Sequence, residues 1–406
     1  MPDPITWNDL VKAIGDLTTI SEEIDTKILT HNLDASAHGQ ADEAVYMHRI
    51  NSLLDHVNYS IYNIKLHPET RTVKAFVDIG GAAEFSTIQE AIDYTHALGG
   101  GKVFVKAGTY TNATDLILYT NIELEGEDND TTIIDFNNTA NKIKAEGNAG
   151  LHLKNIHVSN LKFVNRNSNA NGAVYFYYCD DISVKNCKFD NNVSVTTPFG
   201  NSIRLDQCTR AVIRENYLSS GDYFVYATTS TKVEIIENQL EALNYSIVKA
   251  ETVVRLYVHA NYSTGTNDVA IRGSDCSNAQ ITDNHLILTS NDGINMSLST
   301  FSDRCIIANN YIEVNEDCVI GIDVSGDSDN CIIIANIISG GIDTGIWLDD
   351  GDNTLVANNQ LVDNAVGILI DNTCDRSNII GNNLYTCTTK ITNNGTNTSQ
   401  TGNITA

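Results

Sequence analysis

An asparagine recurs through the second half of the chain at a nearly constant interval, each time within a short segment of β-branched residues. The steps between successive asparagines are 22, 23, 23, 26, 26, 23 and 23 residues. A period in this range is typical of a solenoid, in which successive coils of the chain stack on one another. The aligned residues are Asn216, Asn238, Asn261, Asn284, Asn310, Asn336, Asn359 and Asn382.

Apolar and polar residues alternate before each of these asparagines, as in Val356-Ala357-Asn358-Asn359-Gln360-Leu361. An alternation of period two indicates a β-strand. We expect the asparagine at the bend that follows, because it tolerates the left-handed backbone conformation. Asparagines aligned in stacked coils are also expected to hydrogen-bond in a ladder.

A second set of apolar segments repeats out of phase with the first, and each member begins with glycine. Two strands and two or three turns per coil, stacked about 4.8 Å apart, describe an all-β solenoid, the right-handed parallel β-helix. We predict this fold for residues 72–406, with about 11 to 12 coils at that spacing. The segments begin at Gly293, Gly321, Gly345 and Gly367.

These repeats resemble the pectin-lyase-like superfamily over roughly residues 72–400. The resemblance includes the entrance, Phe85–Tyr94 followed by Gly99–Tyr110. Here Ser86 is the expected N-cap of a short helix near 86–98, with Gln89 completing a capping box. The apolar stripe of Ile88, Ala91, Ile92 and Leu98 is expected to cover the open end of the first coil.

Composition limits the classes of partner. The 406 residues carry a net charge of −26, which makes nucleic acid a poor partner. No segment is long and apolar enough to insert in a membrane, and the N-terminus lacks the basic start and apolar run of a signal peptide. The nine cysteines are interpreted as reduced, with several stacked inside the coils.

Residues 1–30 carry a heptad seam, with one polar break at Ser21, instead of the coil repeat. This spacing predicts a parallel coiled coil, and isoleucine at both seam positions favours a homotrimer. The alternative is an amphipathic helix packed on its own β-helix. Three heptads are marginal alone, so a trimer needs a further contact downstream. The seam residues are Trp7, Leu10, Ile14, Leu17, Ile24 and Ile28.

Residues 31–71 form a linker or attachment segment that contains five of the ten histidines. The stretches 31–40, 44–49 and 54–56 resemble a motif of tail-fibre and related virion proteins of phages of Gram-positive bacteria. This resemblance implies attachment to other virion proteins through the N-terminus and a location on the virion surface after assembly in the host cytoplasm. A histidine ring on a trimer axis could bind a metal, but structural histidines are more common and no metal is assigned.

Acidic residues supply the candidate catalytic groups. The polygalacturonase constellation and the Tyr-Gly-x-Asp-Pro-His run of alginate-type epimerases are both absent from the sequence, so the resemblance predicts a fold and no activity. Asp349 and Asp371 share one register in adjacent coils, which would place their carboxylates about 5 Å apart, as in retaining glycosidases. Asp323 could join them. The alternatives are a solvated acidic face, or a Ca²⁺ site that adds Asp350 and Asp352.

Aromatic residues supply the candidate glycan-binding groups. Tyr175, Tyr177, Tyr226 and Trp347 lie on strands where alternate side chains face outward. An outward stripe would stack on sugar rings, whereas inward members would form a core ladder. The sequence thus favours a homotrimeric phage fibre or spike that binds host-surface polysaccharide without cutting it. The runner-up is a polysaccharide depolymerase, a glycoside hydrolase or lyase, on the same β-helix. A third option is a free extracellular carbohydrate enzyme, against which the missing signal peptide argues.

Overall fold

The computed structural model describes residues 73–81, 83–166, 172–190, 201–219, 221–241, 243–266, 269–289, 292–296, 302–314, 319–326 and 328–404. The chain divides into two units, Met1–Thr70 and Arg71–Ala406. Every element below belongs to the second unit. The predicted seam and the histidine-containing segment lie outside the described residues, so their trimerisation and attachment roles stay predictions.

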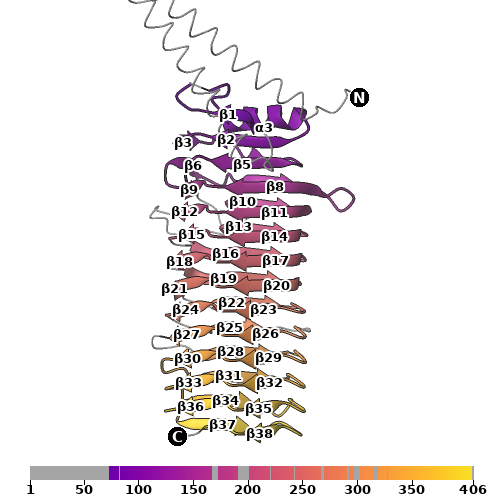
Figure 1. Ribbon diagram of the computed structural model, residues 1–406, viewed down its shortest axis with the longest axis vertical. Helices are drawn as coiled ribbons and strands as arrows, with labels where there is room; N and C mark the ends of the chain where they lie inside the picture. Colours follow the sequence, from indigo (N-terminus) through magenta and orange to yellow (C-terminus); the bar gives the residue numbers. More distant parts are fainter. Residues whose placement is uncertain are drawn as a thin grey trace, which may run out of the picture. The chain divides into compact units, whose positions relative to one another are not determined.

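Three parallel sheets, which we call A, B and C, form the walls of the solenoid (Figure 1). Each full coil contributes one strand to sheet C, then one to sheet A, then one to sheet B. The predicted all-β parallel solenoid, with about 12 turns, is confirmed. The expectation of two strands per coil is wrong, because the residues after each aligned asparagine form a third strand.

Sheet A has 14 strands. They are β1 (Val73–Val77), β2 (Gly101–Val105), β5 (Ile122–Gly126), β8 (Leu153–Ser159), β11 (Cys179–Lys185), β14 (Thr209–Arg214), β17 (Thr231–Ile236), β20 (Val254–His259), β23 (Gln280–Thr282), β26 (Ile306–Ala308), β29 (Ile332–Ile334), β32 (Leu355–Ala357), β35 (Asn378–Ile380) and β38 (Ser399–Thr401).

Sheet B has 12 strands. They are β3 (Gly108–Thr111), β6 (Thr132–Thr139), β9 (Lys162–Arg166), β12 (Lys188–Asp190), β15 (Tyr217–Leu218), β18 (Gln239–Glu241), β21 (Tyr262–Thr266), β24 (His285–Leu288), β27 (Tyr311–Val314), β30 (Ile337–Ser339), β33 (Gln360–Val362) and β36 (Asn383–Tyr385).

Sheet C also has 12 strands. They are β4 (Leu116–Ile117), β7 (Ile143–Glu146), β10 (Val174–Tyr177), β13 (Ile203–Asp206), β16 (Gly221–Thr228), β19 (Leu243–Glu251), β22 (Ile271–Ser274), β25 (Ile294–Met296), β28 (Ile320–Ser325), β31 (Thr344–Asp349), β34 (Val366–Ile370) and β37 (Thr389–Asn393).

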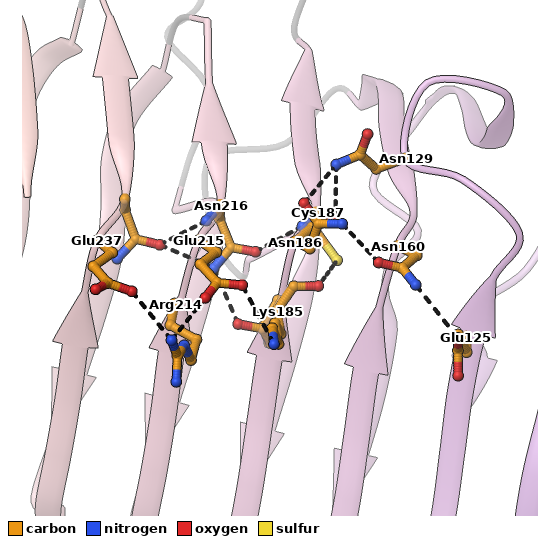
Figure 2. Close-up of polar contacts among 12 residues, drawn as sticks. Glu125, Asn129, Asn160, Lys185, Asn186, Cys187, Arg214, Glu215, Asn216 and Glu237 are labelled. Carbon is orange, nitrogen blue, oxygen red and sulfur yellow. Dashed lines mark hydrogen bonds and ion pairs between the residues drawn. The ribbon is translucent and has the colours of Figure 1, made fainter. Parts of the chain in front are cut away.

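The asparagine ladder forms at the turn between sheets A and B. The side-chain amide of Asn216 donates to Oδ1 of Asn238 (3.0 Å), and that of Asn238 donates to Asn261 (2.9 Å). Each amide also donates to a carbonyl of the preceding coil, as Asn216 does to Val184 (3.0 Å). The ladder continues through Asn382 to Asn403, and Figure 2 shows Asn216 at its start. The predicted ladder is therefore confirmed.

The left-handed residue of this turn is the one before each ladder asparagine. Glu215, Glu237 and Ala260 have φ between 54° and 56°, and Asn309 and Asn358 take the same place in later coils. The expectation that the ladder asparagine itself adopts this conformation is wrong. A non-glycine residue there costs about 1–2 kcal/mol. The buried hydrogen bonds of the following asparagine offset that cost.

The repeated glycines lie within one residue of the start of strands in sheet C, where the neighbouring coil passes too close for a side chain. A Cβ on Gly321 would lie 2.6 Å from the carbonyl oxygen of Gly345, and one on Gly345 would lie 2.7 Å from that of Gly367. The glycine stripe thus marks a line of close approach between backbones.

Helix α3 (Ile88–Ala97) packs against β1, β2 and β4 at the first coil (Figure 1). Its N-cap is Thr87, whose hydroxyl oxygen accepts from the backbone N–H of Glu90 (3.4 Å), so the expected Ser86–Gln89 box is wrong by one residue. Gln89 instead pairs with the edge strand β4: it accepts from the N–H of Ile117 (2.7 Å) and donates to its carbonyl (3.3 Å). Leu98, expected in the apolar stripe, is exposed.

Eight of the nine cysteines lie in the described residues, where all are buried and none forms a disulfide. These cysteines are Cys179, Cys187, Cys208, Cys276, Cys305, Cys331, Cys374 and Cys387.

No helix of the described residues is long and apolar enough to cross a membrane.

Candidate functional site: the outer face of sheet C

Parallel register aligns the outward side chains of sheet C into two columns that run along the solenoid. The first, which we call the cation–aromatic column, alternates positive and aromatic residues before it turns polar and acidic. The second lies two residues further along each strand. The first column contains Lys144, Tyr175, Arg204, Tyr226, Lys249, Arg272, Asn295, Asp323, Trp347 and Leu369.

The middle of the cation–aromatic column is a continuous cation–π stack. The Arg204 guanidinium carbon lies 6.0 Å from the ring centroid of Tyr175 and 5.2 Å from that of Tyr226. On the far side, the Lys249 ammonium lies 4.7 Å from the Tyr226 centroid. Contacts of this kind hold both charge and ring in fixed positions.

The second column neutralises these cations. Asp206, 7 % exposed, accepts hydrogen bonds from Arg204 (2.9 Å), Tyr175 (3.2 Å) and Thr228. Glu251 accepts from the Tyr226 hydroxyl (2.7 Å) and pairs with Lys249 (3.0 Å). Burial and the hydrogen bond to Glu251 raise the pKa of Tyr226 to about 12, so this tyrosine keeps its proton near neutrality. The two columns together are largely charge-balanced and rich in hydrogen-bonding groups.

Tyr223 and Tyr245 lie near the start of β16 and β19, beside the cation–aromatic column. Their rings stack 5.2 Å apart at an interplanar angle of 15°, and Tyr245 is 40 % exposed. Arg204, Lys249 and this tyrosine pair were not predicted as site residues. The sequence carries a pattern that could have identified the two cations, because Lys144, Arg204 and Lys249 are each followed two residues later by an acidic residue.

The aromatic residues of these coils divide between the surface and the core. Tyr175, Tyr177 and Tyr226 face outward as expected, although Tyr175 is only 9 % exposed. The inward neighbours Phe176 and Phe224 are fully buried. A separate core ladder of phenylalanines, which joins Phe136, Phe163, Phe189 and Phe224, runs inside the coils. Outward stripe and core ladder therefore coexist.

Asp323 lies lower in the cation–aromatic column, between Asn295 and Trp347 in adjacent coils. It is 5 % exposed, and its Oδ2 accepts a hydrogen bond from the Asn295 amide (2.7 Å). Burial raises the pKa of Asp323 to about 7, with the charges of Asp292 and Asp349 adding to the effect and the Ser325 hydroxyl opposing it. A carboxyl group with this pKa exchanges its proton near neutral pH.

Asp349 and Asp371 occupy equivalent places in adjacent coils, since Leu348 pairs with Ile370 and the Asp371 N–H donates to the Leu348 carbonyl (2.9 Å). Their carboxylates have different partners. Asp349 accepts from the Thr373 hydroxyl (3.5 Å), whereas Asp371 accepts from the N–H of its neighbour Asn372 (2.6 Å). The structure brings Asp349 into electrostatic contact with Asp323.

The remaining residues of the Ca²⁺ hypothesis lie in the next turn, between sheets C and A. Asp352 Oδ1 accepts from the N–H of Asp375 (2.6 Å), and its other oxygen lies 3.7 Å from Arg376. Within the described ranges, no three His, Cys, Asp or Glu side chains converge to hold a metal ion.

The fold defines the chain as a right-handed parallel β-helix protein. The family model described as "Periplasmic copper-binding protein (NosD)" matches residues 194–406, just over half of the chain. The chain belongs to this NosD family. No curated protein sequence matches it.

Two solved structures illustrate the similarity. The A-module of mannuronan C-5 epimerase AlgE6 from Azotobacter vinelandii is 17 % identical, with 79 % of this chain and 94 % of that chain covered and a TM-score of 0.56. DFA-IIIase from Arthrobacter chlorophenolicus A6, in complex with GF2, is 15 % identical, with 76 % and 94 % covered and a TM-score of 0.58. At these identities the likeness shows the fold, which this chain shares with polysaccharide-processing enzymes.

Proposed function

We propose that the protein binds a polysaccharide along the outer face of sheet C. The observation that carries the proposal is the stack of Tyr175, Arg204, Tyr226 and Lys249 on four successive coils. Aromatic faces pack against the C–H surfaces of sugar rings, and paired charges beside them offer donors and acceptors to hydroxyl groups. A linear polymer laid along the solenoid would meet these groups at regular intervals, already held in place.

This binding fits the role of a phage fibre or spike. In this proposal residues 1–30 assemble a homotrimer, residues 31–71 join it to other virion proteins, and the β-helix presents its binding face to the host-surface glycan. The support comes from the heptad seam and from the resemblance of residues 31–56 to virion proteins. The β-helix supplies a rigid shaft for such a role.

The experiment tests binding with a matched pair of tyrosine variants. Full-length protein is run in affinity electrophoresis against alginate, polygalacturonate, inulin and wall polysaccharide from Gram-positive bacteria. At least one polymer is expected to retard the wild type, and Tyr226→Ala is expected to reduce the retardation strongly. Tyr257→Ala, on the outer face of sheet A, is the control. The proposal fails if no polymer retards the wild type, or if the control loses binding equally.

A second candidate, polysaccharide cleavage, is favoured by Asp323. A general acid works best when its pKa lies near the working pH, and the pKa of this buried carboxyl is about 7. Trp347 follows it in the column as a stacking platform, and Asp349 supplies a second carboxylate. In this candidate Asp323→Asn abolishes the release of new reducing or unsaturated ends while binding survives, and Asp371→Asn has the smaller effect. Absence of new ends with the wild type would exclude cleavage of the polymers used.

The name of the NosD family refers to copper, but the described residues do not fit a copper site. Copper in proteins is held by His, Cys and Met side chains. In the described ranges the cysteines are buried in the core, and no three His, Cys, Asp or Glu side chains converge. Our proposal therefore includes no copper.

A further inference from the structure

The outer face of sheet A changes character along the solenoid. In its first half, charged and polar side chains project outward, including Glu123, His157, Lys185 and Arg214. Figure 2 shows Lys185 and Arg214 there, in ion pairs with the turn residue Glu215. On the four strands β26, β29, β32 and β35, aliphatic residues replace them almost completely.

We call this surface the aliphatic patch. Pairing between strands aligns its residues in two rows, one on each side of the inward column of Ile307, Ile333 and Val356. Its larger members are half-buried except Ile380, which is 41 % exposed, and its two alanines, Ala308 and Ala357, are 8 % and 6 % exposed. The patch consists of Ile306, Ala308, Ile332, Ile334, Leu355, Ala357 and Ile380.

Polar residues bound the aliphatic patch on its sides and ends. Gln280 and Thr282 precede it in β23, and Ser399 and Thr401 follow it in β38. Along one side runs a ladder of aspartates, in which each backbone N–H donates to the carboxylate of the preceding coil, as Asp352 does to Asp329 (3.0 Å). An apolar centre with a polar rim is the usual composition of a protein–protein interface.

We propose that the aliphatic patch is where parallel copies of this chain meet along their shafts. Its side chains offer no hydrogen-bond donor or acceptor and no aromatic ring, so they do not suit a glycan. Chains with a net charge of −26 repel one another, and a close contact therefore needs a stretch of surface without charge. The patch is such a stretch on sheet A.

A second copy also fits the geometry of the patch. Its rows run along the stacking direction, so two shafts side by side in the same register present the same ribbon to each other. The heptad seam of residues 7–28 predicts parallel copies but is too short to hold them alone. The patch supplies the downstream contact that this assembly needs. The inference rests on the homotrimer of the proposed function and is independent of the glycan site.

The first experiment measures the mass of full-length protein by sedimentation velocity over a hundredfold concentration range. The double variant Ile332→Lys/Leu355→Lys places charges in the patch, and we expect it to dissociate at concentrations at least tenfold higher than the wild type. The control Val212→Lys changes a residue in the same outward row of β14, outside the patch. It should behave as the wild type. Far-UV circular dichroism checks that all three proteins are folded.

The second experiment detects the contact directly by cross-linking. Leu355→Cys in the full-length chain should form a covalent dimer with a short bismaleimide, whereas Val212→Cys should not. Suppose that the wild type is a trimer, that the lysine pair does not weaken it, and that Leu355→Cys forms no covalent dimer. The proposed contact through the aliphatic patch is then wrong, whereas the proposed trimeric fibre still stands. That result would point to coverage by the same chain or by another protein. A monomeric wild type overturns both the patch and the trimer, whereas failure of glycan binding alone leaves the patch unaffected.

Discussion

The outer face of sheet C in its middle coils and the outer face of sheet A in its last coils are built by the same rule and differ in chemistry. On both, every second residue faces outward and register aligns it with the next coil. The first carries paired charges and tyrosines (Tyr175 to Lys249), and the second carries aliphatic side chains at every outward position except Asn378 (Ile306 to Ile380). Inward positions in both regions are uniformly apolar. Core packing therefore restricts the inward side of each strand to apolar residues, whereas the chemistry of the outward side can differ between regions.

The largest effect on stability should come from a substitution in the buried asparagine ladder, on which both outer faces depend. Asn261→Leu removes the acceptor for the backbone N–H (3.1 Å) and the side-chain amide (2.9 Å) of Asn238. Buried polar groups left unpaired cost about 1–3 kcal/mol each. We expect a loss of about 4–5 kcal/mol from the free energy of unfolding in urea. Gln360→Ala, at an exposed position beside the ladder residue Asn359, is the control, and an equal loss there would contradict the ladder's role.

The second effect is a pH dependence of stability that arises from the buried acid Asp323 on sheet C. Asp323 has a raised pKa of about 7 in the folded state, against about 4 in the unfolded chain. The fold therefore prefers the protonated acid, and stability is lost as the pH rises from about 4 to about 7. The pKa difference corresponds to a loss on the order of 4 kcal/mol.

Asp323→Asn tests this dependence, because it keeps the shape and removes the charge. The variant should match the wild type near pH 4 and exceed its unfolding free energy at pH 8. Asp371→Asn serves as the comparison. A wild-type stability that does not fall between these pH values would contradict the buried-acid assignment.

A smaller effect should separate the two outer faces by function. Tyr226→Ala removes the ring between Arg204 and Lys249, and loss of one stacking contact weakens glycan affinity by about 1–1.5 kcal/mol, roughly tenfold. Ile332→Lys in the aliphatic patch should leave that affinity unchanged. Equal losses, measured by calorimetry with the polymer that binds, would show that the faces do not act separately.

The smallest effect should appear at the capped end of sheet C. Gln89→Ala removes two hydrogen bonds to the edge strand β4. Because water can replace part of this pairing, we expect a loss of about 1 kcal/mol. Hydrogen exchange at Ile117 should accelerate, while exchange in the ladder region should not. Unchanged exchange at Ile117 would show that Gln89 does not protect this edge.

The candidate site was only partly predictable. Tyr175, Tyr226 and Asp323 could be named from the sequence, because each follows the alternation of a strand. Their partners could not. Asn295 and Asp323 are 28 residues apart, yet Asp323 and Trp347 are 24 apart, and both pairs are neighbours. Turns of unequal length make the spacing irregular, so the membership of a column does not follow from a fixed period.

What the sequence by itself determined is the coil: asparagine at one turn, glycine where backbones approach, and alternating apolar residues that must be buried. These features follow from local geometry and from the burial of apolar surface, both of which a repeat displays directly. Only the tertiary structure decided which outward side chains lie together, how far Asp323 is removed from water, and where the aliphatic patch begins and ends. Those properties arise from register between residues more than twenty positions apart, and the backbone pairing of stacked coils sets that register.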